Sequence, residues 1–213
     1  RRFGNANKLL QDWNGKSLYL HTFEKLLRIR AKDPQNISLT VVTQYPEIYQ
    51  EVKEYSGVHA VFCEESRLGV SYTIKAGIRA VQEAYTPERK ECCFAEEEIS
   101  SETEKKKSWD YLMFTVADQP NLSEKSIEAL IRAAVMQDRS AKQSSFSLRC
   151  GEQVGNPCMF RADLIPELMQ LEGDKGGRSV LKKHECCYVE IENEEEFSDI
   201  DTEEQIKKNS TVS

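Results

Sequence analysis

The sequence predicts a single α/β domain in which helices cover a mostly parallel sheet. Three observations lead to this prediction. Strand-like segments alternate with helix-like segments along the chain, which is the pattern of a parallel sheet with helical crossovers. A length of 213 residues suits one such domain. Outside two highly charged stretches, 86–108 and 190–201, the chain contains enough Leu, Ile, Val and Phe for a core.

The first half of the chain shows this alternation clearly. Ser17 is placed to cap a helix with an apolar stripe. Pro46 stands at a first-turn position, where proline is tolerated. The predicted elements are a helix over 17–30, a strand over 37–43, a helix over 46–55, a strand over 58–62 and a helix over 71–84.

Residues 86–108 interrupt the alternation. This segment carries Pro87, a glutamate run at 96–98 and a lysine run at 105–107. A stretch so rich in charge and so poor in apolar residues cannot contribute to a core. We therefore expect a surface insertion here.

The second half resumes the pattern. Ser123 is a predicted N-cap, with Leu122 placed to pack on Ile127. Thr202 and Gln205 have the spacing of a capping box, so a last helix is expected to begin near Thr202. The other predicted elements are strand 110–117, helix 124–137, strands 144–150 and 156–160, helix 163–170, a glycine-rich loop over 172–178, helix 179–184 and strand 186–191.

Charge and cysteine usage exclude several classes of function. The net charge of −7 argues against non-specific binding to nucleic acid, which needs a basic face. No stretch approaches the roughly 20 apolar residues of a membrane span. The seven cysteines are odd in number and lack metal-site spacing, so we expect reduced thiols and a cytoplasmic location.

The N-terminal segment is a candidate phosphate-binding loop. Arg2, Gly4 and Lys8 combine positive charge with a glycine that lets the backbone approach an anion. A solvated basic segment is the alternative interpretation.

Asp118 is the candidate metal ligand. It follows an apolar strand and precedes Gln119 and Pro120. Ligands of open α/β sheets bind at the carboxyl ends of strands, and a carboxylate there suits Mg²⁺. The alternative is an aspartate that only forms the turn before proline.

Two further loops contain motifs of interest. One is Gly155-Asn156-Pro157, which leads into an apolar strand. The other runs over 173–178 and is dense in glycine and in charges of both signs. The second loop suits closure over an anionic ligand, while a plain surface turn is the alternative.

Taken together, these motifs resemble those of the MobA-like nucleotidyltransferases, and within them the molybdenum cofactor cytidylyltransferases. The similarity covers nearly the whole chain. It rests on the order of the motifs Arg2-Phe3-Gly4 with Lys8, Gly15-Lys16-Ser17-Leu18, Gly69-Val70-Ser71-Tyr72-Thr73-Ile74-Lys75-Ala76-Gly77, Asp118-Gln119-Pro120, Gly155-Asn156-Pro157, Gly173-Asp174-Lys175-Gly176-Gly177-Arg178 and Asp199-Ile200-Asp201-Thr202.

The resemblance implies a three-layer Rossmann-like fold and transfer of CMP from CTP to a molybdopterin-type cofactor, for delivery to an apo molybdenum hydroxylase. It implies that Arg2, Lys8 and Asp118 act in catalysis and that Asp118 and Asp201 bind Mg²⁺. The implied nucleotide-binding residues are Gly4, Lys8, Ser71, Lys75 and Asp118. The implied acceptor-binding residues are Asn156, Pro157, Asp174, Lys175 and Asp201. For Asp199 and Asp201, capping of a helix N-terminus is an equal alternative to the metal or acceptor role.

Two departures from the family leave other functions open. The family's first strand and the Leu-Ala-Ala-Gly part of its loop are not in this sequence, and a sheet without that strand would lack a central strand. The second departure is the insertion over 86–108. One alternative function is nucleotidyl transfer to another phosphorylated small molecule. The other is a non-catalytic protein that carries a cofactor. A phosphate-transferring kinase is disfavoured because the chain has no GxxxxGK[ST] loop.

Overall fold

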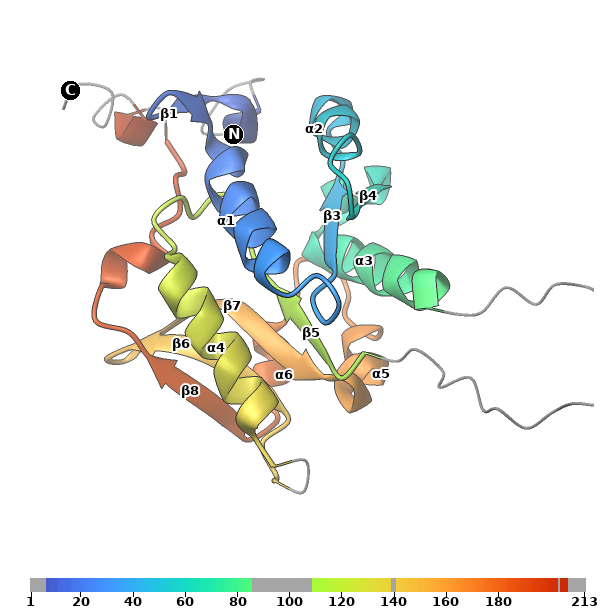
Figure 1. The fold of residues 1–213 in the computed structure, drawn as a ribbon, viewed down its shortest axis with the longest axis vertical. Coiled ribbons are helices and arrows are strands. Elements are labelled where there is room, and N and C mark those ends of the chain that lie inside the picture. Colours follow the sequence, from blue (N-terminus) through green and yellow to red (C-terminus); the bar gives the residue numbers. More distant parts are fainter. Residues whose placement is uncertain (1–6, 86–108, 139–140, 203, 207–213) are drawn as a thin grey trace, which may run out of the picture.

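The computed structural model describes residues 7–85, 109–138, 141–202 and 204–206 (Figure 1). The helices are α1 (Leu18–Lys32), α2 (Pro46–Val52), α3 (Val70–Tyr85), α4 (Glu124–Met136), α5 (Ile165–Leu168) and α6 (Arg178–Leu181). The strands are β1 (Asp12–Trp13), β2 (Lys16–Ser17), β3 (Leu39–Thr43), β4 (Val58–Phe62), β5 (Tyr111–Phe114), β6 (Ser145–Cys150), β7 (Gln153–Arg161) and β8 (Cys186–Glu190). Four 3₁₀ helices connect them, η1 (Lys8–Leu10), η2 (Glu64–Leu68), η3 (Ala162–Leu164) and η4 (Glu194–Phe197).

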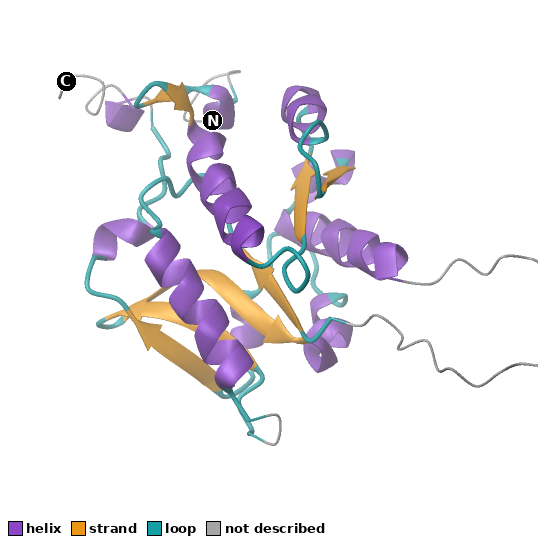
Figure 2. Ribbon diagram, viewed as in Figure 1, coloured by secondary structure: helices purple, strands orange, loops and turns teal. Residues whose placement is uncertain are grey.

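The larger strands form two sheets. β3 and β4 pair in parallel, and a four-stranded sheet has the order β5-β7-β6-β8 (Figure 2). Within the described ranges, β3 has β4 as its hydrogen-bonded neighbour and β5 has β7. No described strand pairs with both β3 and β5, so the two sheets are not joined by hydrogen bonds within the described ranges. This agrees with the expectation that the sheet lacks a central strand.

The larger sheet is mostly parallel in strand direction, as expected, but it contains one reversed strand, because β5, β6 and β8 run the same way and β7 runs against them. The reason is local. β6 and β7 are joined by a tight turn in which Cys150 pairs with Gln153, and so short a connection can only join antiparallel strands.

Helices cover both faces of the four-stranded sheet, which confirms the three-layer α/β class (Figure 1). Alternation along β7 divides the core in two. Phe160 packs with α3, α5 and α6 on one face. Met159 packs with α4 and with Ile29 of α1 on the other. Phe146 and Phe160 are fully buried, one on each face, so both halves of the core are closed to solvent.

The β3–β4 sheet has its own packing. Tyr19 and Phe23 of α1 and Ile48 and Val52 of α2 form a core against these strands. α3 approaches closely at Gly77, where an added Cβ would lie 3.2 Å from the Val42 side chain. This sheet is therefore held by its helices as much as by its one parallel pairing.

The predicted helix starts differ in how they are capped. Ser123 caps α4 as expected, because its side chain accepts a hydrogen bond from the Ser126 N–H. Leu122 and Ile127 are both fully buried. Ser17 stands at the N-cap of α1, but its hydroxyl makes no capping bond, so that expectation was wrong.

Three other predicted elements also need comment. The helix predicted over 163–170 is split into η3 and α5, because Pro166 lacks the N–H that would continue the helical ladder. β7 begins at Gln153 rather than at residue 156, because its first residues complete the hairpin with β6. The predicted insertion lies outside the described residues.

Two further observations concern membrane-spanning helices and the state of the cysteines. None of the helices within the described ranges is long and apolar enough to cross a membrane. The cysteines in the same ranges are free thiols, namely Cys63, Cys150, Cys158, Cys186 and Cys187.

Candidate functional site

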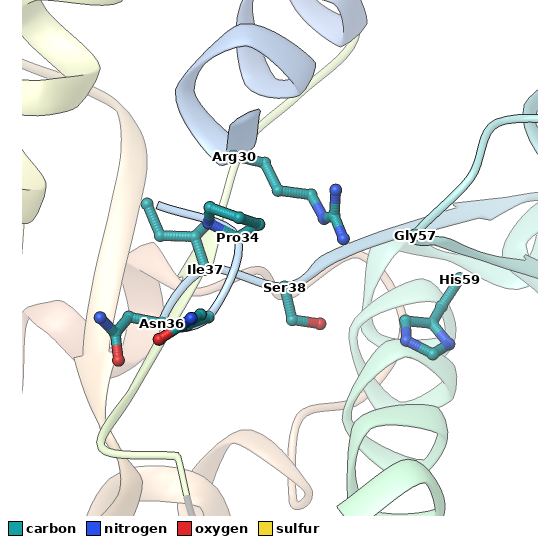
Figure 3. A pocket seen from close by; sticks show the side chains of 8 residues that line it. Arg30, Pro34, Asn36, Ile37, Ser38, Gly57 and His59 are labelled. Carbon is teal, nitrogen blue, oxygen red and sulfur yellow. The ribbon is translucent and has the colours of Figure 1, made fainter. Parts of the chain in front are cut away.

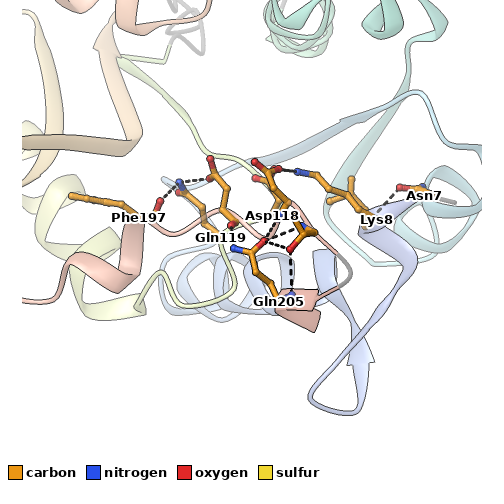
Figure 4. A network of polar contacts seen from close by, with 10 residues as sticks. Asn7, Lys8, Asp118, Gln119, Phe197 and Gln205 are labelled. Carbon is orange, nitrogen blue, oxygen red and sulfur yellow. Dashed lines mark hydrogen bonds and ion pairs between the residues drawn. The ribbon is translucent and has the colours of Figure 1, made fainter. Parts of the chain in front are cut away.

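Three of the predicted residues meet around one ammonium group (Figure 4). The Lys8 Nζ donates to Asp118 Oδ2 at 2.6 Å and to Asp201 Oδ1 at 2.9 Å. Lys8 lies in η1, Asp118 follows β5 and Asp201 follows η4. The side chains of Lys8, Asp118 and Asp201 are 28%, 20% and 43% exposed, so the cluster is partly enclosed but reachable from solvent.

Asp118 is held by the turn that follows β5. The next residue, Gln119, is buried, and its Nε2 donates to the Phe197 carbonyl at 3.2 Å and to Asp199 Oδ1 at 2.8 Å. The Gln119 carbonyl accepts from the Thr22 hydroxyl at 3.2 Å. Gln119 therefore joins the turn after β5 to α1 and to the segment after η4.

Asp201 is positioned by its neighbours in the chain. The Ile200 N–H donates to the Asp118 carbonyl at 3.0 Å, and the Ile200 side chain is buried with Trp13 and Leu18. Gln205 Oε1 accepts from the N–H groups of Asp201 at 2.8 Å and Thr202 at 2.9 Å.

The same bonds show which residue caps the last helical turn. The Thr202 hydroxyl accepts from the Gln205 N–H, which completes the expected capping box. Thr202 therefore caps this turn, and the side chain of Asp201 points instead to Lys8.

The pKa shifts follow from the crowding of charge in this cluster. Partial burial lowers the pKa of Lys8, but the hydrogen bonds to Asp118 and Asp201 outweigh it, so the pKa is raised overall. For Asp199, burial raises the pKa, the hydrogen bond from Gln119 lowers it, and the charges of Asp118 and Asp201 raise it further. The cluster therefore attracts cations and disfavours additional negative charge.

The donor set fits a hard divalent cation. Within the described ranges, no group of three or more His, Cys, Asp or Glu side chains is arranged to bind a metal. Mg²⁺, however, is commonly bound by only one or two carboxylates together with water and substrate phosphates. Asp118 and Asp201 already converge on one cation, the Lys8 ammonium. Two carboxylate ligands from the protein therefore fit the metal that the sequence predicts.

Ser71 and the loop over 173–178 form a second group. The Ser71 N–H, in the first turn of α3, donates to the Gly173 carbonyl at 3.1 Å. Gly69 has a φ of +138°, and a Cβ there would lie 2.3 Å from the Gly173 oxygen. The Ser71 hydroxyl is buried and has no hydrogen-bond partner within the described ranges. The two motifs thus pack backbone against backbone.

The predicted residues around this pair are more open. Asp174 and Lys175 are exposed, whereas Lys75 is half-buried in α3. No described residue forms a hydrogen bond or an ion pair with the Lys75 side chain, so its charge is available to an anion. All three remain predicted ligand contacts.

Gly155 joins the two groups. A Cβ on Gly155 would lie 2.1 Å from the Phe197 ring, so only glycine fits there. The Arg178 Nη2 donates to the neighbouring Val154 carbonyl at 2.6 Å. Asn156 is half-buried and precedes the buried Pro157 through a cis peptide bond. Contacts thus continue from Gln119 through Phe197 to the loop over 173–178.

Some predicted residues lie outside the described ranges, and some functional residues were not predicted. Arg2 and Gly4 are outside those ranges, so their roles stay predictions. Sequence analysis assigned no role to Gln119 or Phe197, and it assigned Gln205 only a capping role. Gln119 belongs to the Asp-Gln-Pro motif, but its partners Phe197 and Asp199 are distant in sequence. Gln205 lies just after the last motif, and its bond to the Asp201 N–H depends on the local fold. No local pattern marks such contacts.

Comparison with known proteins identifies the sequence family of the chain. Residues 1–187 match the sequence family described as the MobA-like NTP transferase domain. No curated protein sequence matches the chain.

Solved structures show the same fold at low sequence identity. Rv0371c from Mycobacterium tuberculosis H37Rv superposes with a TM-score of 0.65 at 15% identity, covering 96% of this chain and 88% of that one. CMP:2-keto-3-deoxy-manno-octonic acid synthetase complexed with CTP has a TM-score of 0.60 at 13% identity, with 94% and 89% covered. The molybdopterin-guanine dinucleotide biosynthesis protein A from Archaeoglobus fulgidus has a TM-score of 0.62 at 13% identity, with 100% and 92% covered.

Proposed function

This chain belongs to the MobA-like NTP transferase family, and from that premise we propose that it transfers CMP from CTP to a molybdopterin-type cofactor. The observation that carries the proposal is the convergence of Asp118 and Asp201 on one cation beyond the end of β5. Nucleotidyl transfer needs neutralisation of phosphate charge and precise positioning more than covalent chemistry by the protein. A pair of carboxylates able to hold a divalent metal meets the first need.

In the proposed reaction, a phosphate oxygen of the acceptor attacks the α-phosphorus of CTP in line. A new bond forms between that oxygen and the α-phosphorus. The bond from the α-phosphorus to the oxygen bridging to the β-phosphate breaks, and pyrophosphate leaves with the electron pair. Mg²⁺ bound by Asp118 and Asp201 would neutralise phosphate charge.

The chain's own residues would bind and orient the two substrates. Arg2 and Lys8 are proposed to contact the triphosphate and to stabilise the departing pyrophosphate. Gly4, Ser71 and Lys75 are proposed to lie along the nucleotide. The acceptor is assigned to the side formed by Asn156, Pro157, Asp174 and Lys175.

Several similarities support the choice of substrates. One solved neighbour is complexed with CTP, another carries molybdopterin in its name, and Rv0371c has also been solved with manganese. An apo molybdenum hydroxylase is the proposed recipient of the product. A cytoplasmic location is proposed because that compartment supplies NTPs and keeps thiols reduced.

A second candidate keeps the reaction and changes the acceptor. The neighbour solved with CTP carries a sugar acid, rather than molybdopterin, in its name. The same carboxylate pair would serve either acceptor, so the pair alone does not select between them.

The test is pyrophosphate release by the full-length protein with Mg²⁺, the molybdopterin-type cofactor and each of CTP, GTP, ATP and UTP in turn. We expect release with CTP, reduced roughly 100-fold or more in Asp118→Ala, since even outer-shell partners of a metal contribute 10- to 100-fold. Asp163→Ala removes an aspartate that pairs with Arg161 and serves as the control. Circular dichroism confirms that both variants fold.

The other outcomes are equally informative. Equal turnover of GTP would refute the choice of CTP. Release only with a different phosphorylated acceptor would support the second candidate. If no NTP releases pyrophosphate while the cofactor still binds, the protein is a cofactor carrier and not a transferase.

A further inference from the structure

A pocket lies at the far end of α1 from the candidate active site. Its volume is about 590 Å³, and it is lined by Arg30, Pro34, Gln35, Asn36, Ile37, Ser38, Gly57 and His59 (Figure 3). It lies where β3 and β4 begin, whereas Asp118 follows the end of β5. Leu18, at the other end of α1, packs with Ile200 beside Asp201. At 1.5 Å per residue, Arg30 is about 18 Å from Leu18 along the helix.

Within the described ranges, the Arg30 guanidinium has no ion-pair partner in this pocket, and its Nε is buried without a hydrogen bond. By contrast Arg28, two positions earlier, pairs with Glu124 at 2.7 Å. The buried Nε–H of Arg30 is costly, because this donor has lost water without gaining a hydrogen bond.

The backbone beside Arg30 fits this position of the guanidinium. Gly57 has a φ of +74°, and a Cβ there would lie 2.0 Å from Arg30 Nη2. Any larger residue at this position would therefore displace the guanidinium from the pocket wall. Figure 3 shows the Arg30 side chain extending toward Gly57, with Ser38 and His59 nearby.

The lining favours an anion. It contains no Asp or Glu, although the whole chain has a net charge of −7. Asp33 lies in the turn before the pocket, and its carboxylate accepts two hydrogen bonds from Asn36 Nδ2, at 3.0 and 3.1 Å. Ser38 and His59 can donate further hydrogen bonds.

We propose that this pocket binds a small phosphomonoester, whose phosphoryl group pairs with Arg30. A planar guanidinium forms paired hydrogen bonds with phosphate oxygens, and such charge-assisted bonds are the strong ones. The volume falls within the range of small-molecule sites. The site requires neither the metal nor the nucleotide of the proposed reaction, so it constitutes a second, independent ligand site.

The first experiment observes Arg30 directly in the wild-type protein. The ¹⁵N-labelled full-length protein is titrated with glycerol 2-phosphate, and separately with inorganic phosphate, in EDTA to keep metal away from Asp118. We expect a saturable shift of the Arg30 Nε–Hε resonance with both probes. Absence of a saturable shift overturns the proposal. Saturation with inorganic phosphate alone also overturns it, because the pocket then excludes an ester.

The second experiment measures binding by calorimetry with matched variants. Arg30→Met should weaken binding of glycerol 2-phosphate at least tenfold. Arg30→Lys should weaken binding less, because lysine keeps the positive charge but cannot form the paired hydrogen bonds of a guanidinium. Arg28→Met and Asp118→Asn should bind like the wild type. Equal binding by Arg30→Met, or loss in Asp118→Asn, refutes the site. If Arg30→Met does not fold, the affinity of Arg30→Lys and the shift of the Arg30 Nε–Hε resonance in the wild type still test the proposal.

Discussion

At the scale of single residues, Lys8 is the side chain on which the site depends. Its ammonium occupies the space between Asp118 and Asp201, where the metal is proposed to bind. A metal can enter only when the ammonium moves away, and the freed charge is then available to the triphosphate. Lys8 therefore pairs with Asp118 and Asp201 in the absence of substrate, and we propose that it pairs with the triphosphate when substrate is bound.

This exchange leads to a prediction for Lys8→Met. Without nucleotide, the variant should bind Mn²⁺ more tightly, by about tenfold or 1.4 kcal/mol, because no ammonium competes for the carboxylates. Turnover of CTP should fall in the same variant. Calorimetric titration with Mn²⁺ measures the first effect. Lys16→Met removes a lysine that pairs with Glu24 instead, and it should leave Mn²⁺ affinity unchanged. Weaker Mn²⁺ binding by Lys8→Met would contradict the exchange.

A second residue-scale prediction concerns Cys186. Burial raises its pKa to about 11. Between pH 9 and 11 the folded state therefore keeps the thiol proton, whereas the unfolded state, in which the thiol has its ordinary pKa near 9.0, has released it. Because the folded state binds more protons in this window, the free energy of unfolding should fall as the pH rises from 9 to 11.

The size of this loss should be about 1–2 kcal/mol, allowing for partial exposure of the thiol. Urea unfolding at a series of pH values measures it, and Cys186→Ser should abolish this part of the pH dependence. An identical pH dependence in the variant would show that Cys186 does not cause it.

At the scale of elements, two serines at helix starts provide a matched comparison. Both were predicted as N-caps, but only Ser123 forms the capping bond. Ser123→Ala should lower the free energy of unfolding by about 1 kcal/mol, and Ser17→Ala by less than about 0.5 kcal/mol. Denaturant unfolding compares the two variants. If both variants lose the same free energy of unfolding, the hydrogen bond from the Ser126 N–H to Ser123 does not stabilise the protein.

The same comparison shows what the sequence reveals about elements. Apolar spacing and cap residues identify α1 and α4 because these signals are local. Whether a cap bond forms depends on the chain before the helix, and Ser17 is itself part of a two-residue strand pairing, opposite Asp12. The broken helix near Pro166 and the early start of β7 likewise follow from a proline and a hairpin partner.

At the scale of the whole molecule, the α/β class could be predicted and is confirmed. Asp118 and Asp201 were named as candidate metal ligands, but the long-range contacts that bring them together could not be predicted. The mixed direction of the larger sheet depends on the β6–β7 hairpin. The position of Asp201 depends on contacts of Gln119 and Ile200 with residues far away in sequence. Spacing along the chain does not encode such contacts.

Gln119 provides the test of this long-range assembly. Gln119→Met keeps the length of the side chain but loses its hydrogen bonds to Phe197 and Asp199. The variant should lose about 1–3 kcal/mol of stability. The Ile200 amide, which donates to the Asp118 carbonyl, should exchange its hydrogen faster. Urea unfolding and amide hydrogen exchange measure the two effects.

The control for this variant is Gln137→Met, since Gln137 bonds to Gln143 at the end of α4. It should cost less than about 0.5 kcal/mol. Unchanged exchange at Ile200 in Gln119→Met would show that Gln119 does not hold the second carboxylate in place.

The distance in sequence between Asp118 and Asp201 has a consequence for biosynthesis. A ribosome delivers the first carboxylate in mid-synthesis and the second only after the last strand, β8, has been made. A nascent chain therefore lacks one carboxylate of the proposed metal-binding pair until the C-terminal segment has been made. The carboxylate pair is completed only when the C-terminal segment folds back onto the turn after β5.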